Sequence, residues 1–129
     1  MFIISIIKQE HLSPFCGFMH SIRNGHASLA SDLMEPFRYQ IVDSIAIQEL
    51  RNKKSILDGF TLDTSTGNIY LDNEFRKEYI RKIIKKLNST HKYMGKEETY
   101  RDTIRNNVRQ YKHIINTKNI EYYEPLRLK

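Results

Sequence analysis

Apolar side chains recur every three or four residues over long stretches of this chain, and no other feature limits its fold as strongly. From Phe75 to Leu87 they fall on one face of a helix, with lysine and arginine on the other. From Tyr100 to Ile115 the same spacing returns. A half-buried strand would instead alternate apolar and polar residues at every second position. We therefore expect a mainly α fold.

The first half of the chain continues the helical pattern. The run from Phe2 to Glu10 indicates a buried helix, although no capping residue precedes it. Ser28 can cap a second helix, and the segment from Ile41 to Leu50 indicates a third. Pro36 lies inside the second helix and has no N–H to donate to the Asp32 carbonyl, which predicts a kink or a break there.

One segment is typical of strands. In FTLDTSTGNIYL, residues 60–71, two short β-prone runs flank a Thr-Gly-Asn turn, and this pattern predicts a small hairpin. The segment NSTHKYMGKEE, residues 88–98, indicates a loop. The expected fold is therefore a multi-helical domain with one small β-hairpin.

The charge of the chain is positive and unevenly distributed. The formal net charge is +6 and the pI is about 9.4, which favours an anionic partner such as nucleic acid. Residues 73–129 hold 15 Lys and Arg against 7 Asp and Glu, whereas residues 1–72 hold 6 against 8. Arg101, Arg105, Arg109 and Lys112 form a stripe opposite the apolar face of the last helix. This arginine stripe is either a surface that contacts DNA or only a solvated one.

Two features bear on the compartment. Cys16 is the only cysteine, which excludes an internal disulfide and fits a reducing cytoplasm. The apolar opening MFIISII ends at Lys8, too short to span a membrane and without the basic start of a signal peptide. We therefore expect a cytoplasmic protein without a membrane partner.

The stretch GFMHSIRNGHASLASDLMEPFR, residues 17–38, contains residue types suited to a metal ion. Asp32 and Glu35 are three residues apart and project from one face of a helix, where two carboxylates repel each other unless a cation lies between them. His20, in the preceding turn, can add a nitrogen ligand. Such ligands suit Mg²⁺ or Mn²⁺. The alternative is a histidine that only makes hydrogen bonds and two acids that favour the helix dipole.

The same stretch resembles the signature of the CRISPR-associated adaptation integrase, the first-numbered CRISPR-associated protein. That signature has glycine, an aromatic and an aliphatic residue and histidine, followed by Ser-Leu, Asp-Leu-Met-Glu and Phe-Arg. The segments IVDSIAIQEL, EFRKEYIRKI and TYRDTIRNNVRQY are similar to later helices of the family. The resemblance therefore covers nearly the whole chain.

By this resemblance, His20 and Glu35 are metal ligands and Asp32 is a nearby catalytic acid. The expected DNA-binding residues are Arg23, Arg38, Arg101, Arg105 and Arg109. The family's metal, Mg²⁺ or Mn²⁺, assists DNA strand cleavage and the joining of a DNA 3′-hydroxyl to a phosphodiester, which inserts spacer DNA into a CRISPR array. The implied partners are spacer and repeat DNA and the second-numbered CRISPR-associated protein.

Two parts of the family pattern are missing from this sequence. The family has a further glutamate ligand on an earlier helix and, before it, an N-terminal β-rich domain used for dimerisation. Glu10, the only acid upstream of His20, does not match that glutamate position. We therefore expect residues 1–129 to be a partial C-terminal α-helical catalytic domain, inactive by itself, from a truncated or split gene.

Three interpretations follow from the sequence. The first is a metal-dependent DNA endonuclease and integrase of CRISPR spacer acquisition, completed by a separate N-terminal fragment. The second is a non-catalytic DNA-binding or assembly module derived from the same family. The third is an unrelated small basic helical DNA binder.

Overall fold

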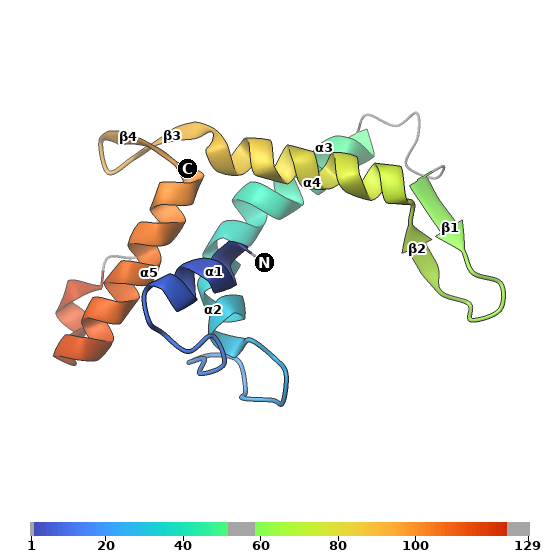
Figure 1. The fold of residues 1–129 in the computed structure, drawn as a ribbon. Coiled ribbons are helices and arrows are strands. Elements are labelled where there is room, and N and C mark those ends of the chain that lie inside the picture. Colours follow the sequence, from blue (N-terminus) through green and yellow to red (C-terminus); the bar gives the residue numbers. More distant parts are fainter. Residues whose placement is uncertain (1, 52–58, 124–129) are drawn as a thin grey trace.

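Figure 1 shows a chain of helices joined by two short hairpins. The computed structural model describes residues 2–51 and 59–123. The elements within those ranges are α1 (Phe2–Gln9), α2 (Ser28–Phe37), the π-helix η1 (Arg38–Asp43), α3 (Ser44–Arg51), β1 (Phe60–Leu62), β2 (Ile69–Leu71), α4 (Asn73–Asn88), β3 (Thr90–Tyr93), β4 (Lys96–Thr99), α5 (Tyr100–Thr117) and the 3₁₀-helix η3 (Ile120–Tyr122). The expected mainly α fold is confirmed.

Both long helices begin at residues that cap them. The Asp72 carboxylate accepts the backbone N–H of Glu74 at 2.9 Å and that of Phe75 at 3.4 Å, as its place before α4 predicts. The Thr99 hydroxyl accepts the N–H of Asp102 at 3.1 Å and so caps α5. These bonds satisfy N–H groups that have no partner inside the helix.

The start of α2 differs from the prediction. The capping position is Ala27, and Ser28 is the first residue of the helix rather than its cap. The Ser28 hydroxyl instead donates to the Ser21 carbonyl at 3.0 Å. The cap prediction was wrong because Ser28 uses its side chain to hold the preceding loop.

Pro36 changes the helix without ending it. The regular α-helical pattern stops at Phe37, and the chain continues through the wider turns of η1 into α3. The predicted break is therefore a change of helix type, which accommodates the missing proline N–H. The predicted helix from Ile41 to Leu50 is formed by the second half of η1 and most of α3.

The structure contains the predicted hairpin and also a second one. Strands β1 and β2 are antiparallel, with Thr61 opposite Tyr70. Strands β3 and β4 form another antiparallel pair where a loop was expected. Met94 and Gly95 connect them with φ of 48° and 81°, and positive φ at both central residues is the geometry of a tight hairpin turn.

The core lies where α1, α2 and α5 meet, with α4 and η1 closing one end. In Figure 1, α4 runs across the top of the molecule and α5 descends past α1 and α2. The buried cluster comprises Ile3, Ile6, Ile7, Leu29, Ala30, Leu33, Phe37, Ile41, Leu87, Tyr100, Ile104 and Val108. Ile80 and Ile84 share the apolar side of α4 with Leu87 but are nearly half exposed. Among the described helices, none is long and apolar enough to cross a membrane.

Candidate functional site

The carboxylate of Asp32 organises the turn that carries His20. Its Oδ2 accepts the backbone N–H of Phe18 at 2.6 Å and of Met19 at 3.0 Å, and its Oδ1 accepts that of His20 at 3.0 Å. Oδ1 also contacts the His20 imidazole through Nδ1. The Asp32 side chain is fully buried, so its negative charge is compensated by these donors rather than by water.

These contacts keep Asp32 ionised and decide which ring nitrogen of His20 carries a proton. Burial by itself would raise the pKa of Asp32, but the hydrogen bonds from Met19, from the His20 side chain and from Phe18 outweigh it and lower that pKa to about 2. An ionised carboxylate can only accept hydrogen bonds, so Nδ1 of His20 is the nitrogen that carries the proton. In neutral His20, Nε2 then holds the free lone pair.

The turn can approach Asp32 this closely because residue 17 is glycine. A Cβ at Gly17 would lie 2.6 Å from Asp32 Oδ2 and 2.7 Å from Ser28 Cβ. On the other side of the turn, the Leu29 N–H donates to the Pro14 carbonyl at 3.0 Å. The first turn of α2 therefore holds the His20 segment through backbone and side-chain contacts.

Glu35 lies one turn further along α2, in a different environment. Its side chain is half exposed, and Oε2 is 4.0 Å from Arg38 Nη1. No hydrogen bond or ion pair in the described part of the chain joins it to His20. His26, in the loop between them, has its ring centroid 6.1 Å from that of His20. The structure thus brings together His20 and Asp32, and Glu35 follows Asp32 three residues later on α2.

The donor chemistry fits part of a magnesium or manganese site. Nε2 of His20 and the exposed carboxylate of Glu35 are ligand types that these ions accept, whereas both oxygens of Asp32 are already occupied. Within residues 2–51 and 59–123, no three His, Cys, Asp or Glu side chains form a group that could hold a metal. A site built on His20 and Glu35 therefore needs at least one further donor.

Two predicted DNA-binding arginines flank α2 in the sequence, and both have exposed side chains. Arg38, the first residue of η1, is more than half exposed and places Nε 3.8 Å from Asp43 Oδ1. Arg23 is exposed in the loop between His20 and α2. Both side chains are accessible to a polyanion.

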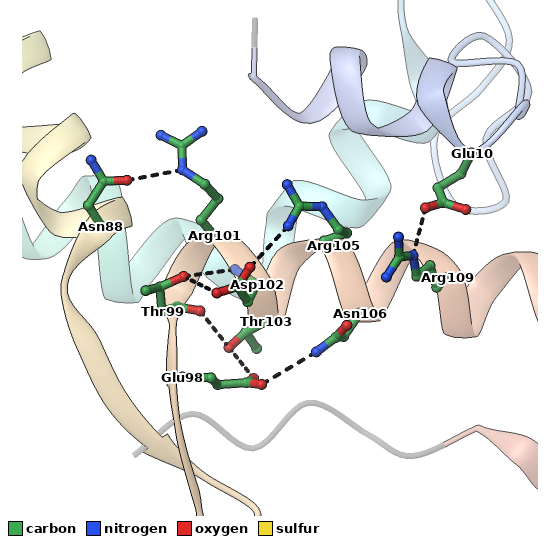
Figure 2. Close-up of polar contacts among 10 residues, drawn as sticks. All are labelled: Glu10, Asn88, Glu98, Thr99, Arg101, Asp102, Thr103, Arg105, Asn106 and Arg109. Atoms are coloured by element: carbon green, nitrogen blue, oxygen red, sulfur yellow. Dashed lines mark hydrogen bonds and ion pairs between the residues drawn. The ribbon is translucent and has the colours of Figure 1, made fainter.

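The arginine stripe on α5 is engaged with the rest of the chain, as Figure 2 shows. Arg101 donates to Asn88 Oδ1 at 3.0 Å, Arg105 to Asp102 Oδ1 at 3.0 Å, and Arg109 to Glu10 Oε1 at 2.7 Å. Arg101 also lies over the ring of Phe2. These cations therefore have structural partners, although Arg109 remains more than half exposed.

Sequence reasoning missed several residues that build the site. Gly17 acts through its lack of a side chain, and Phe18 and Met19 act through backbone groups that no side-chain pattern reveals. Glu10 was considered only as a possible ligand, whereas the hydrogen bond from Arg109 and the charge of Lys112 lower its pKa. The available signal was the Gly17 position, directly before the aromatic residue and three residues before His20.

Comparison with known proteins gives a consistent result. The family described as "CRISPR associated protein Cas1" matches residues 2–85. The chain is 33% identical over 121 residues to "CRISPR-associated endonuclease Cas1 3" of Thermus thermophilus, covering 92% of this chain and 35% of that protein. It is 30% identical over 127 residues to "CRISPR-associated endonuclease Cas1" of Clostridium perfringens, covering 97% and 37%. The chain thus spans a little over a third of the length of these relatives.

Solved structures show the same fold. One, described as "Casposase bound to integration product", superposes with a TM-score of 0.80 at 27% identity, over 99% of this chain and 37% of that one. A Cas1 protein from Thermotoga maritima superposes with a TM-score of 0.74 at 22% identity, over 88% and 35%. The second likeness concerns the fold alone.

Proposed function

Because the chain belongs to the Cas1 family, we propose that it takes part in CRISPR spacer acquisition as part of a metal-dependent DNA endonuclease and integrase. The observation that supports this most strongly is the buried Asp32 carboxylate, which fixes a partly exposed His20 by its backbone and by its ring. The His20 side chain is 46% exposed, and with Nδ1 on Asp32 its Nε2 is the ring nitrogen left to bind a metal ion.

In this proposal His20 and Glu35 hold Mg²⁺ or Mn²⁺, and Asp32 orients His20. Such carboxylate–histidine–metal arrangements fix the ring and raise the basicity of the ligand nitrogen. When bound, the ion activates water or a 3′-hydroxyl and stabilises phosphoryl oxygens. Arg38 and Arg23, which flank α2 in the sequence, contribute positive charge to the path of the DNA backbone.

The remaining ligand comes from outside these residues. Glu10 does not supply it, because its carboxylate lies 2.7 Å from Arg109 Nε and 3.6 Å from Lys112 Nζ. We place the missing donor in the glutamate that the family carries on an earlier helix, outside residues 1–129. The second-numbered CRISPR-associated protein is the proposed protein partner, with spacer and repeat DNA as substrates.

Binding of Mn²⁺ alone tests the ligand assignment. Paramagnetic broadening of NMR signals should be strongest at His20 and Glu35, and His20→Ala or Glu35→Gln should weaken Mn²⁺ binding. Glu74→Gln, at another exposed helical glutamate, is the matched control and should leave binding unchanged. Equal binding by all four proteins would overturn the metal assignment.

A DNA assay then separates the functional alternatives. The chain with Mn²⁺ should be inactive on branched and duplex DNA and should gain activity when a fragment with the missing region is added. Activity of the chain alone, abolished by Glu35→Ala, would contradict the need for a further ligand. Duplex binding without activity in both cases would instead identify a non-catalytic DNA-binding module.

A further inference from the structure

Helix α5 contacts the segment from Glu10 to His20 at two points. Near the start of this segment, Arg109 donates to Glu10 at 2.7 Å, which is visible in Figure 2. Near its end, the ring of Tyr111 lies against that of Phe18, with centroids 5.2 Å apart and planes inclined by 32°. Arg109 and Tyr111 are two residues apart on α5, so one short stretch of helix supports both ends of the segment.

Phe18 transmits the second contact to the site. Its ring meets Tyr111, while its N–H is the first of the three consecutive donors to Asp32. A shift of Phe18 therefore moves the peptide groups of Met19 and His20 that follow it. The Phe18 side chain is 56% exposed, so the surrounding core does not enclose it and Tyr111 is its aromatic neighbour.

Two helices, α2 and α5, hold the turn that carries His20. Asp32 pulls the turn towards α2 through hydrogen bonds, and Gly17 leaves no free space between the turn and that helix. Tyr111 approaches the turn from α5: it packs against the buried cluster and its ring faces that of Phe18, and burial together with the nearby Asp32 charge raises its pKa. The turn is thus held between α2 and α5.

We propose that Tyr111 is a positioning residue for His20, acting through Phe18. Its ring contacts Phe18, and its effect is to keep the three N–H donors aligned with the carboxylate. The inference rests on the proposed function only in treating His20 as functional. Its structural content, the coupling of α5 to the ring of His20, is independent of any metal.

The test uses NMR on the full chain at neutral pH without metal. In Tyr111→Leu, amide exchange of residues 18–20 should become about fivefold to tenfold faster, the range that loss of an aromatic pair supports. The imidazole ¹⁵N shifts of His20 should also lose the pattern of a proton fixed on Nδ1. Tyr111→Phe keeps the ring and should restore both signals.

Two further variants keep the result decisive. Val108→Ala removes a fully buried side chain from the same helix and should lower global stability without changing the His20 signals. Phe18→Ala truncates an exposed ring, so the chain should still fold, and it should reproduce the Tyr111→Leu effect with no added loss in the double variant. If Tyr111→Leu does not fold, Phe18→Ala alone tests whether the Phe18 ring positions the turn.

Unchanged exchange and unchanged imidazole shifts in Tyr111→Leu and Phe18→Ala would overturn the inference, as would an equal response in Val108→Ala. Failure of the proposed function is a separate outcome. The coupling between Tyr111 and the turn is measured without metal. Its presence or absence therefore does not depend on whether the chain binds Mn²⁺ at His20.

Discussion

Asp32 holds His20 twice, because one carboxylate oxygen accepts the His20 backbone N–H at 3.0 Å and also contacts imidazole Nδ1. The main chain and the ring of the histidine are therefore fixed by the same buried group on α2. This relationship makes the position of His20 depend on the charge of Asp32, on the shape of the turn and on the helix that backs it.

Removal of the Asp32 charge should destabilise the chain. In Asp32→Asn, the amide NH₂ group replaces one of the two oxygens that accept backbone N–H groups, so donors would face a donor. The free energy of unfolding should therefore fall by about 2 kcal/mol or more. Asp43→Asn is the matched control, since that side chain is 42% exposed and should change stability by less than about 0.5 kcal/mol. Urea denaturation measures both, and equal losses would contradict a special role for Asp32.

The fall in the free energy of unfolding at low pH should also report the role of Asp32. The pKa of Asp32 is lowered from 3.8 to about 2 in the folded chain, so between these values the unfolded state binds more protons. The stabilisation is complete above pH about 4 and is lost as the pH falls towards 2. Asp32→Asn should flatten this part of the curve.

A second acid titrates in that window and has to be separated. Hydrogen bonds from Ser65 and Thr66 lower the pKa of Asp63 to about 2 in the β1–β2 turn. The comparison is therefore best made in an Asp63→Asn background, by measuring urea midpoints from pH 2 to 6. A slope that Asp32→Asn leaves unchanged would mean that Asp32 is not held as an ion.

Gly17→Ala should disturb the site by a steric clash. The added methyl would lie 2.6 Å from Asp32 Oδ2 and 2.9 Å from the Ser28 carbonyl carbon, so the turn must move, at a cost of about 1–3 kcal/mol. Gly25→Ala meets nothing within 4 Å but has φ of 74°, so its cost comes from the backbone alone. Only the Gly17 variant should change the NMR signals of His20, and a matching change in Gly25→Ala would refute the close-approach argument.

The arginine stripe predicts a change in salt dependence. If Arg101, Arg105 and Arg109 bind phosphates, replacing all three with glutamine should reduce the log–log salt slope of duplex binding by about 0.9 per lost contact. Replacing Arg76, Lys77 and Arg81 on α4 removes equal charge elsewhere and is the control. Fluorescence anisotropy over a salt series gives both slopes, and equal changes would indicate a general charge effect rather than a specific surface.

The structure also predicts a difference within the stripe. Arg109→Gln removes the hydrogen bond to the Glu10 carboxylate and leaves it only Lys112 at 3.6 Å, so it should lower the thermal midpoint as well as any DNA affinity. Arg105→Gln breaks a contact three residues away within α5 and should lower the midpoint less. Calorimetry distinguishes the two, and equal midpoints would show that Glu10 and Arg109 do not stabilise the packing of α1 on α5.

The regular elements could be predicted because their causes are local. The apolar spacing of α4 and α5 and the Asp72 cap are visible in the sequence, and both helices formed as expected. The β3–β4 hairpin was missed because its strands are short and rich in charged residues. Its local signal is the Met94-Gly95 pair, which adopts the positive φ of a tight turn.

The site could be predicted in its residue types but not in its connections. His20, Asp32 and Glu35 were singled out by spacing and by resemblance, whereas the hydrogen bonds from residues 18–20 to Asp32 depend on a turn conformation that spacing does not encode. The contact between Phe18 and Tyr111 joins residues more than ninety positions apart in the chain. Only the packing of α5 against α1 and α2 brings them together.

The π-helix after Pro36 links the number of residues in this helix to the direction in which its side chains point. A π turn takes up one more residue than an α turn, and each residue of an α-helix advances by about 100°. Deleting one residue between Arg38 and Asp43 would allow a regular helix that keeps Ile45, now buried, at about the same angle relative to Leu33. Winding all the present residues as a regular α-helix would instead turn Ile45 by about 100°. The π winding therefore absorbs one extra residue without changing the phase of the flanking helices, so that α2 presents Asp32 to the turn while α3 presents Ile45 to the interior.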